Sequence, residues 1–332
     1  MGDWDCNLPR VMRLPVLRVA LLISATLCAS TVPAAETYPV KPVRIIVPSG
    51  AGGADDVVAR ILAAKLSELA GQQFIVENRP GAGGILGHAL VLKAPPDGYT
   101  LLLGARSMAG TRFVNAQVNM DVLRDYTPIS LLEHSHFVML VHPSVPARNV
   151  KDYIALARTR PGKMTYASLG TGQTTYWCVT LFNSMARINA VEIPYKTGVS
   201  AIVDLISGQV DYFFPSAVLA LANRDKLRAL AVTGSERSTM LPDVPTMSEA
   251  ALPGYDMPSS RTLLGPAGMR RDIVATLNTA VGRALAAPDL RDRFNKAGSQ
   301  PAPSRPEELA RRYAEWAVDF ARIAKDAGIK PQ

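Results

Sequence analysis

The sequence predicts an α/β protein whose two similar lobes close on a ligand like a clamshell. Strand-like apolar runs alternate with helix-like periodic segments, which is the order of a mostly parallel sheet flanked by helices. This order occurs twice, at residues 43–104 and again at 163–214. In each copy a glycine-rich turn joins the first strand to the first helix. Two such halves in one chain favour a ligand site between them.

The elements of the first half follow from its hydrophobic periodicity. "VRIIV" is the first strand, and apolar residues then recur at helical spacing as far as Gly71, which is placed to end the helix. "QFIV" and "YTLLL" are the next strands, with the helix "GAGGILGHALVLKA" between them. The second half repeats this with the strands "KMTYAS", "AVEIPY" and "QVDYFF" and the helix "VSAIVDLIS".

Two β-like runs, 129–143 and 253–268, are predicted to connect the halves. Two amphipathic helices follow the second run. The last helix is predicted to open with a capping box formed by Ser304 and Glu307, and to end before Gly328.

Residues 1–35 are predicted to be a cleavable secretory leader. Arginines precede an uncharged run at 19–29, and small residues follow it. This run is shorter than the roughly 20 residues that a membrane-spanning helix needs. Met12 is an alternative start to Met1. Cys28 raises the alternative of a lipoprotein, which the bulky residue before it disfavours.

The composition favours a binder of small anions. Net charge is +8 with the positive residues dispersed, whereas nucleic-acid binders cluster them. Cys178 is the one cysteine outside the leader, and its apolar surroundings predict a buried, unreactive thiol. No intrachain disulfide and no cofactor are expected.

Catalytic and metal motifs are incomplete. Gly50 and Gly52 match the start of a dinucleotide-binding G-x-G-x-x-G, but Asp55 stands at the third glycine. The sequence has no G-x-S-x-G nucleophile elbow and no P-loop lysine. His134 and His136 can share a strand face as metal ligands, but no third ligand is evident, so surface histidines are expected. We therefore expect no catalytic residue and no metal; a secreted α/β enzyme is the competing class.

The glycine loops at 50–54 and 170–174 suit anion binding. Successive backbone N–H groups can converge on an oxyanion, and a following helix N-terminus adds partial positive charge. One loop in each half predicts that a carboxylated ligand bridges the two. The alternative is that the glycines only make tight turns.

The chain resembles the Bug family, the periplasmic substrate-binding proteins of tripartite tricarboxylate transporters. Several segments between Tyr38 and Pro331 carry the likeness: "YPVKPVRIIVP", "GQQFIVENRPGAGG", "APPDGYTLLLG", "GQVDYFF", "LRALAVTGSERS", "LPDVPTMSEA" and "KDAGIKP". The resemblance implies a type 2 periplasmic-binding-protein fold with two crossing hinge strands. Lobe 1 would be 36–135 plus 256–332, and lobe 2 would be 136–255.

The resemblance also implies the function. The protein would be a periplasmic monomer that captures a small organic acid for the membrane subunits of a tripartite tricarboxylate-type transporter, and would not bind nucleic acid. Some relatives serve instead as sensors for a membrane receptor, which is the alternative.

The ligand-binding residues that the resemblance implies fall in two glycine loops and their surroundings. They are Ser49, Gly50, Ala51, Gly52, Gly53, Ala54, Asp55, Ser168, Gly170, Thr171, Gly172, Gln173, Thr174, Thr175, Tyr195, Lys196, Thr197, Gly198 and Ser216.

Several residues depart from the family pattern. Asp55 stands where a small residue or threonine is usual, and it would cap the helix or repel an anion. Tyr176 and Trp177 are expected to add an aromatic wall. Arg106 and Arg261 are expected to pair with a ligand carboxylate if they face the cleft.

Overall fold

The computed structural model describes residues 1–2, 38–116, 118 and 120–331. It separates Met1–Val40 from one compact unit, Lys41–Gln332. The predicted leader lies outside the described residues apart from its first two positions, and the fold below is that of the compact unit. Among the helices described, none is both long enough and apolar enough to cross a bilayer.

The compact unit contains two mixed β-sheets. The first has the strand order β11-β4-β10-β3-β1-β2. Its strands are β1 (Val43–Val47), β2 (Phe74–Asn78), β3 (Thr100–Ala105), β4 (Tyr126–Ser135), β10 (Ser259–Pro266) and β11 (Ser299–Pro301). The pairings make β1, β2, β3 and β4 run in one direction, and β10 and β11 in the other.

The second sheet has the strand order β7-β6-β8-β5-β9. Its strands are β5 (Val138–Val141), β6 (Met164–Ser168), β7 (Ala190–Pro194), β8 (Tyr212–Phe213) and β9 (Arg228–Val232). Only β5 runs against the others. In both sheets the first parallel strand lies between the second and the third, and the third pairs with an antiparallel strand. Beyond that antiparallel strand lie two more strands in the first sheet and one more in the second. The predicted repetition of element order is confirmed, and the two sheets with their helices form two lobes.

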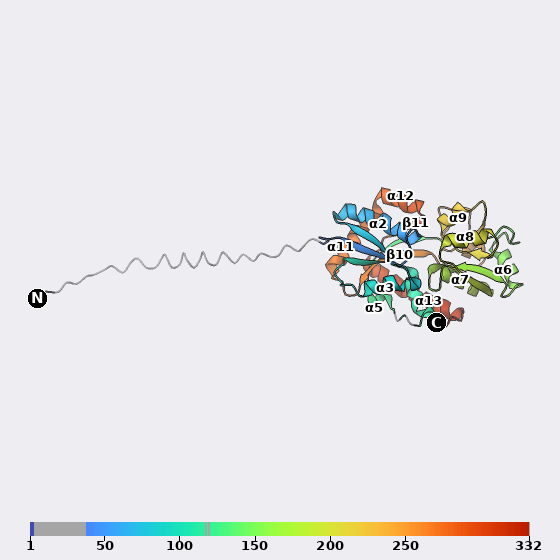
Figure 1. Cartoon of the computed structure of the whole chain (residues 1–332), viewed down its shortest axis with the longest axis horizontal. Helices are drawn as coiled ribbons and strands as arrows, with labels where there is room; N and C mark the ends of the chain where they lie inside the picture. The colour runs from blue at the N-terminus through green and yellow to red at the C-terminus, as the bar shows by residue number, and fades with distance from the viewer. Residues whose placement is uncertain (3–37, 117, 119, 332) are drawn as a thin grey trace. The chain divides into compact units, whose positions relative to one another are not determined.

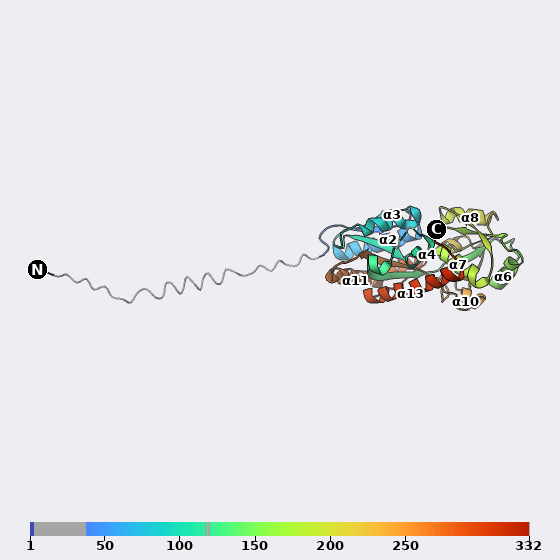
Figure 2. The same ribbon diagram turned by 90° about the horizontal axis from the view of Figure 1, so that it is seen from below.

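Helices flank both sheets (Figure 1). Beside the first sheet are α2 (Ala54–Ala70), η1 (Ala82–Gly84), α3 (Ile85–Leu92), η2 (Arg106–Gly110), α4 (Thr111–Val114), α5 (Val122–Asp125), α11 (Arg271–Ala286), α12 (Pro288–Lys296) and α13 (Pro306–Asp326). Beside the second are α6 (Val150–Arg158), α7 (Thr174–Ala186), α8 (Gly198–Ile206), α9 (Ala217–Ala222) and α10 (Met247–Ala250). Figure 2 shows α13 extending from α11 toward α7, and it contacts both β4 and α7.

The first strand–helix unit forms where the sequence predicts it. Apart from the half-buried Arg44, β1 is apolar and buried, and it pairs with both β2 and β3. Helix α2 buries the residues that recur at helical spacing, and its chain turns at Gly71, whose φ is +66°. This left-handed conformation is easily adopted by glycine and commonly ends helices.

The predicted connecting run 129–143 consists of two strands in different sheets. β4 belongs to the first sheet. β5, which begins after only two more residues, His136 and Phe137, belongs to the second sheet. The return path lies beside it: the Met257 amide donates to the Thr233 carbonyl, and the Thr233 amide donates to the Phe137 carbonyl. The chain therefore passes twice between the sheets at one place.

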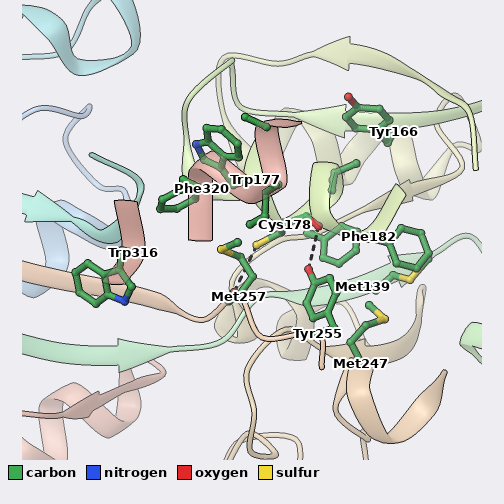
Figure 3. Packing of buried hydrophobic residues seen from close by; sticks show 14 of the residues in the cluster. Met139, Tyr166, Trp177, Cys178, Phe182, Met247, Tyr255, Met257, Trp316 and Phe320 are labelled. Carbon is green, nitrogen blue, oxygen red and sulfur yellow. Dashed lines mark hydrogen bonds between the residues drawn. The ribbon is translucent and has the colours of Figure 1, made fainter. Parts of the chain in front are cut away.

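Aromatic side chains fill the space around these crossings. The rings of Trp177 and Phe320 lie 4.7 Å apart between α7 and α13. Nearby, the Tyr255 hydroxyl donates to the Cys178 carbonyl at 2.9 Å (Figure 3). Cys178 is fully buried, as predicted, and burial raises the pKa of its thiol, which disfavours the reactive thiolate.

The predicted capping box at α13 is wrong. The helix begins at Pro306 with Arg305 as its N-cap and has no side-chain cap. The Ser304 hydroxyl instead accepts the Leu131 amide at 3.0 Å, which ties this segment to β4. A capping box does form at α10, where Thr246 and Glu249 cap each other.

Candidate functional site

The first glycine loop, residues 48–53, joins the carboxyl end of β1 to α2. Residues 50–54 are exposed, and no side chain caps the helix. Gly52 has φ +79° and donates its amide to the Asp56 carboxylate at 2.9 Å. One of the amides expected to face a ligand is therefore engaged within the loop.

Asp55 lies in the first turn of α2 and joins the loop to the centre of the first sheet. Its carboxylate accepts the Ser49 hydroxyl at 3.0 Å and the Nε of Arg261 on β10 at 2.7 Å. The Nη1 of Arg261 donates to Glu133 on β4 at 2.6 Å and to Ser135 at 3.3 Å. Two carboxylates therefore share one guanidinium.

The charges of this network are strongly coupled. Burial lowers the pKa of Arg261, but the carboxylates of Glu133 and Asp55 outweigh burial and raise it. Burial raises the pKa of the Glu133 carboxyl, and Arg261 opposes this effect. The Arg261 side chain is only 7% exposed and Glu133 is not exposed, whereas the Asp55 side chain is 33% exposed. Asp55 is the member of the network that solvent or a ligand can reach.

The second glycine loop, residues 169–173, joins the carboxyl end of β6 to α7. The Ser168 hydroxyl accepts the Gly170 amide at 3.0 Å, and both Gly170 and Gly172 have positive φ. Gln173 is the N-cap and makes no side-chain cap, and the first turn of α7 contains no acidic residue. The Thr175 hydroxyl oxygen in this turn is buried without a partner among the described residues.

The two carboxyl-end regions touch. The Nε2 of Gln173 donates to the Gly83 carbonyl, in the glycine turn after β2, at 3.2 Å. A Cβ on Gly172 would lie 3.4 Å from a methyl of Val114. Gly83 was not among the predicted site residues, although the glycine-rich run "GAGG" that contains it indicates that another segment can approach this backbone closely.

The remaining predicted residues of the second half follow β7 and β8. The Tyr195 hydroxyl donates to Asp204 at 2.8 Å, and Lys196 is exposed. Thr197 caps α8, and Ser216 caps α9. Next to Thr197, Gly198 is the first residue of α8. These residues lie at the carboxyl ends of neighbouring parallel strands, as the second glycine loop does, which is where α/β sheets bind ligands.

Arg106 is engaged elsewhere. Its side chain is 5% exposed and pairs with Asp319 of α13 at 3.3 Å. Its guanidinium lies over the rings of Trp316 and Phe320, 5.8 and 5.9 Å from their centroids. Burial lowers the pKa of this guanidinium. Arg106 thus joins η2 to α13 in this conformation.

Two expectations about aromatic and histidine residues need correction. Trp177 is fully buried against Gly110 and Phe320 and does not form a cleft wall, whereas Tyr176 is half-buried and its place in such a wall stays a prediction. His136 is buried, and His134 is partly buried with its Nδ1 2.8 Å from the Ser260 hydroxyl, so they are not surface histidines. Within the described residues, no three potential metal-binding side chains gather.

A small pocket lies away from both loops. It is lined by Met108, Ala109, Arg112, Met120, Asp121, Val122, Leu123, Tyr313 and Ala317. Its volume of about 40 Å³ has room for a few water molecules, since about 10–15 Å³ suffices for one. This pocket is too small for an organic ligand.

The chain matches known sequences over most of its length. Residues 58–329 match the model of the tripartite tricarboxylate transporter family receptor. BugT of Bordetella pertussis is 32% identical over 319 residues, which cover 95% of this chain and 98% of BugT. A protein encoded in the tcbD-tcbE intergenic region of a Pseudomonas species is 36% identical over 278 residues, 83% of each chain.

Solved structures agree with this match. An R. palustris protein with adipate has a TM-score of 0.82 and 32% identity, covering 89% of this chain and 100% of that one. The periplasmic binding protein BugD has a TM-score of 0.80 and 29% identity, with the same coverage. MatC of Rhodopseudomonas palustris, with bound malate, has a TM-score of 0.78 and 30% identity, covering 86% of this chain and 100% of MatC.

Proposed function

The chain belongs to the tripartite tricarboxylate transporter receptor family and is a solute-binding protein, and from this premise we propose that it captures a small carboxylated organic anion in the periplasm. The ligand lies between the lobes, held by the two glycine loops. The lobes divide at residues 135/136 and 255/256, near the two chain crossings.

One observation carries the proposal. Each sheet ends its first parallel strand in a glycine loop that opens a helix without a side-chain cap. Free N–H groups at such a helix start attract anions, most strongly at α7, whose first turn contains no acidic residue. The hydrogen bond from Gln173 to the Gly83 carbonyl supports an arrangement in which the carboxyl ends of the two sheets face each other.

The relatives support a carboxylate as the ligand. The adipate-bound protein and malate-bound MatC are about as similar to this chain as its sequence relatives are, and both ligands are small dicarboxylates. Closure on such a ligand would bring surfaces of both lobes together. Ligand binding would thus shift the population toward the closed state, and the membrane subunits of a tripartite transporter would recognise the combined surface.

Thermal denaturation with a panel of mono-, di- and tricarboxylates tests the proposal. A ligand at one hundred times its Kd adds about 2.7 kcal/mol to the free energy of unfolding, so a bound carboxylate raises the Tm by several degrees. The uncharged amide of each acid, with every carboxyl group converted, is the control, and mass spectrometry checks that the ligand is recovered unaltered. A panel in which no carboxylate raises the Tm more than its amide contradicts the proposal.

A further inference from the structure

Arg261 is not available to a ligand carboxylate. Its Nε donates to Asp55 at 2.7 Å, and its Nη1 donates to Glu133 at 2.6 Å and to Ser135. The side chain is 7% exposed. A single positive charge shared by two carboxylates leaves none to attract a third.

The first glycine loop has also lost much of its attraction for an anion. Asp55 and Asp56 lie in the first turn of α2, where carboxylates offset the positive end of the helix dipole. The Gly52 amide donates to Asp56. A ligand carboxylate placed here would meet the part of Asp55 that is exposed, and like charges in contact repel.

The second glycine loop offers the opposite environment. The first turn of α7 contains no acidic residue, and no side chain caps it. Thr175 in this turn is 3% exposed, and its hydroxyl oxygen lacks a partner among the described residues. A buried hydroxyl without a partner is uncommon in native proteins and indicates an unmet hydrogen bond.

We propose that Asp55 determines the ligand's polarity and thereby its chemical class. The inference rests on the proposed function. The ligand's carboxylate lies at the second glycine loop. Its other end carries a hydrogen-bond donor, an ammonium or a hydroxyl, that Asp55 accepts. The preferred ligand is therefore an amino or hydroxy monocarboxylate, and a dicarboxylate of equal length is disfavoured.

Isothermal titration with acids of matched length tests this assignment. Adipate, ε-aminocaproate, ε-hydroxycaproate and hexanoate form one series, and succinate, γ-aminobutyrate, γ-hydroxybutyrate and butyrate form a shorter one. In the wild type the amino or the hydroxy acid binds about tenfold or more tighter than the diacid of its series. The amino and hydroxy members distinguish an ammonium from a hydroxyl donor.

Three variants separate the roles. Asp55→Asn retains an acceptor for Arg261 and shifts the preference toward the diacid by about tenfold. Asp272→Asn, which removes an equal charge on the exposed start of α11, leaves the preference unchanged. Thr175→Val, which removes the unpartnered hydroxyl in the first turn of α7, weakens the binding of every carboxylate of a series by a similar factor.

The outcomes are distinct. A wild type that prefers the diacid, or a preference that Asp55→Asn leaves unmoved, overturns the inference but not the proposed function. If the wild type and the folded Asp55→Asn protein both bind none of the acids, the proposed function is overturned, and the inference with it.

Discussion

The two glycine loops occupy equivalent places in their sheets but are held in place differently. The first is tied into its own sheet by charge, through Asp55 and Arg261. The second loop, together with the first turn of α7, contains no charged residue and contacts the other lobe instead: Gly172 approaches Val114, and Gln173 donates to Gly83. Below it, Trp177 of α7 packs on Phe320 of α13.

We infer from this difference that one fold position can serve opposite electrostatic roles. The loop backbone and the helix start are shared, but two acidic residues in the first turn of α2 offset the positive end of its helix dipole. The contrast can be tested by disrupting each loop's support in turn.

Removing the charge support of the first loop has the largest expected effect. Arg261→Met leaves the fully buried Glu133 without its ion-pair partner and should lower the free energy of unfolding by about 3–5 kcal/mol. Urea denaturation measures it. The double variant Arg261→Met with Glu133→Gln should recover at least half of this loss. A single variant that loses less than about 1 kcal/mol would show that the network is not a support.

Crowding the packing below the second loop comes next. A Cβ on Gly110 would lie 2.8 Å from the Trp177 ring, so Gly110→Ala should cost about 1–3 kcal/mol. Gly282→Ala is the matched control, because nothing lies within 4 Å and alanine favours the helix by about 1 kcal/mol. Equal stabilities of the two variants would rule out a tight interface at Trp177.

Acid should act mainly through the first sheet and its helices. Burial lowers the pKa of His88 from 6.5 to about 4. Between pH 6.5 and pH 4 the unfolded chain therefore binds a proton at His88 that the folded chain does not bind. Stability is full above pH 6.5 and falls as the pH drops toward 4, by about 2 kcal/mol at pH 5. His134, on β4, has the same sign.

Chemical denaturation at pH 7 and pH 5 checks this dependence. His88→Leu should reduce the acid loss by about 2 kcal/mol, since it removes one titrating group. An acid loss that is the same in the variant and the wild type would place the effect in other groups.

The smallest stability effect separates a turn from a binding loop. Gly52 and Gly268 both have φ near +80° with open space at the Cβ position, so alanine at either should cost about 1 kcal/mol through backbone strain alone. Only Gly52→Ala should also weaken ligand binding, by about tenfold, as titration would show. Equal affinities in both variants would mean that the first loop is merely a turn.

Local signals in the sequence predicted the elements around the site. "VRIIV" became β1, and Gly71 ended α2 as expected. The capping box at Ser304 failed because β4 competes for that hydroxyl, while the one at Thr246 was overlooked although "TMSE" displays it. The partnership of Asp55 with Arg261 was not predicted: the residues are 206 positions apart, and no local pattern joins them.

The sequence by itself determined the repeated α/β order, the glycine loops and the buried Cys178, because periodicity, turn chemistry and composition act over a few neighbouring residues. Only the tertiary structure decided which partners the charged side chains have. Which strands pair decides whether an arginine faces a ligand or forms ion pairs within its own protein. Here the pairing of β10 with β4 places Arg261 beside Glu133. A buried guanidinium needs nearby carboxylates, so Arg261 pairs with Glu133 and Asp55, and Asp55 is the carboxylate of the two that stays partly exposed.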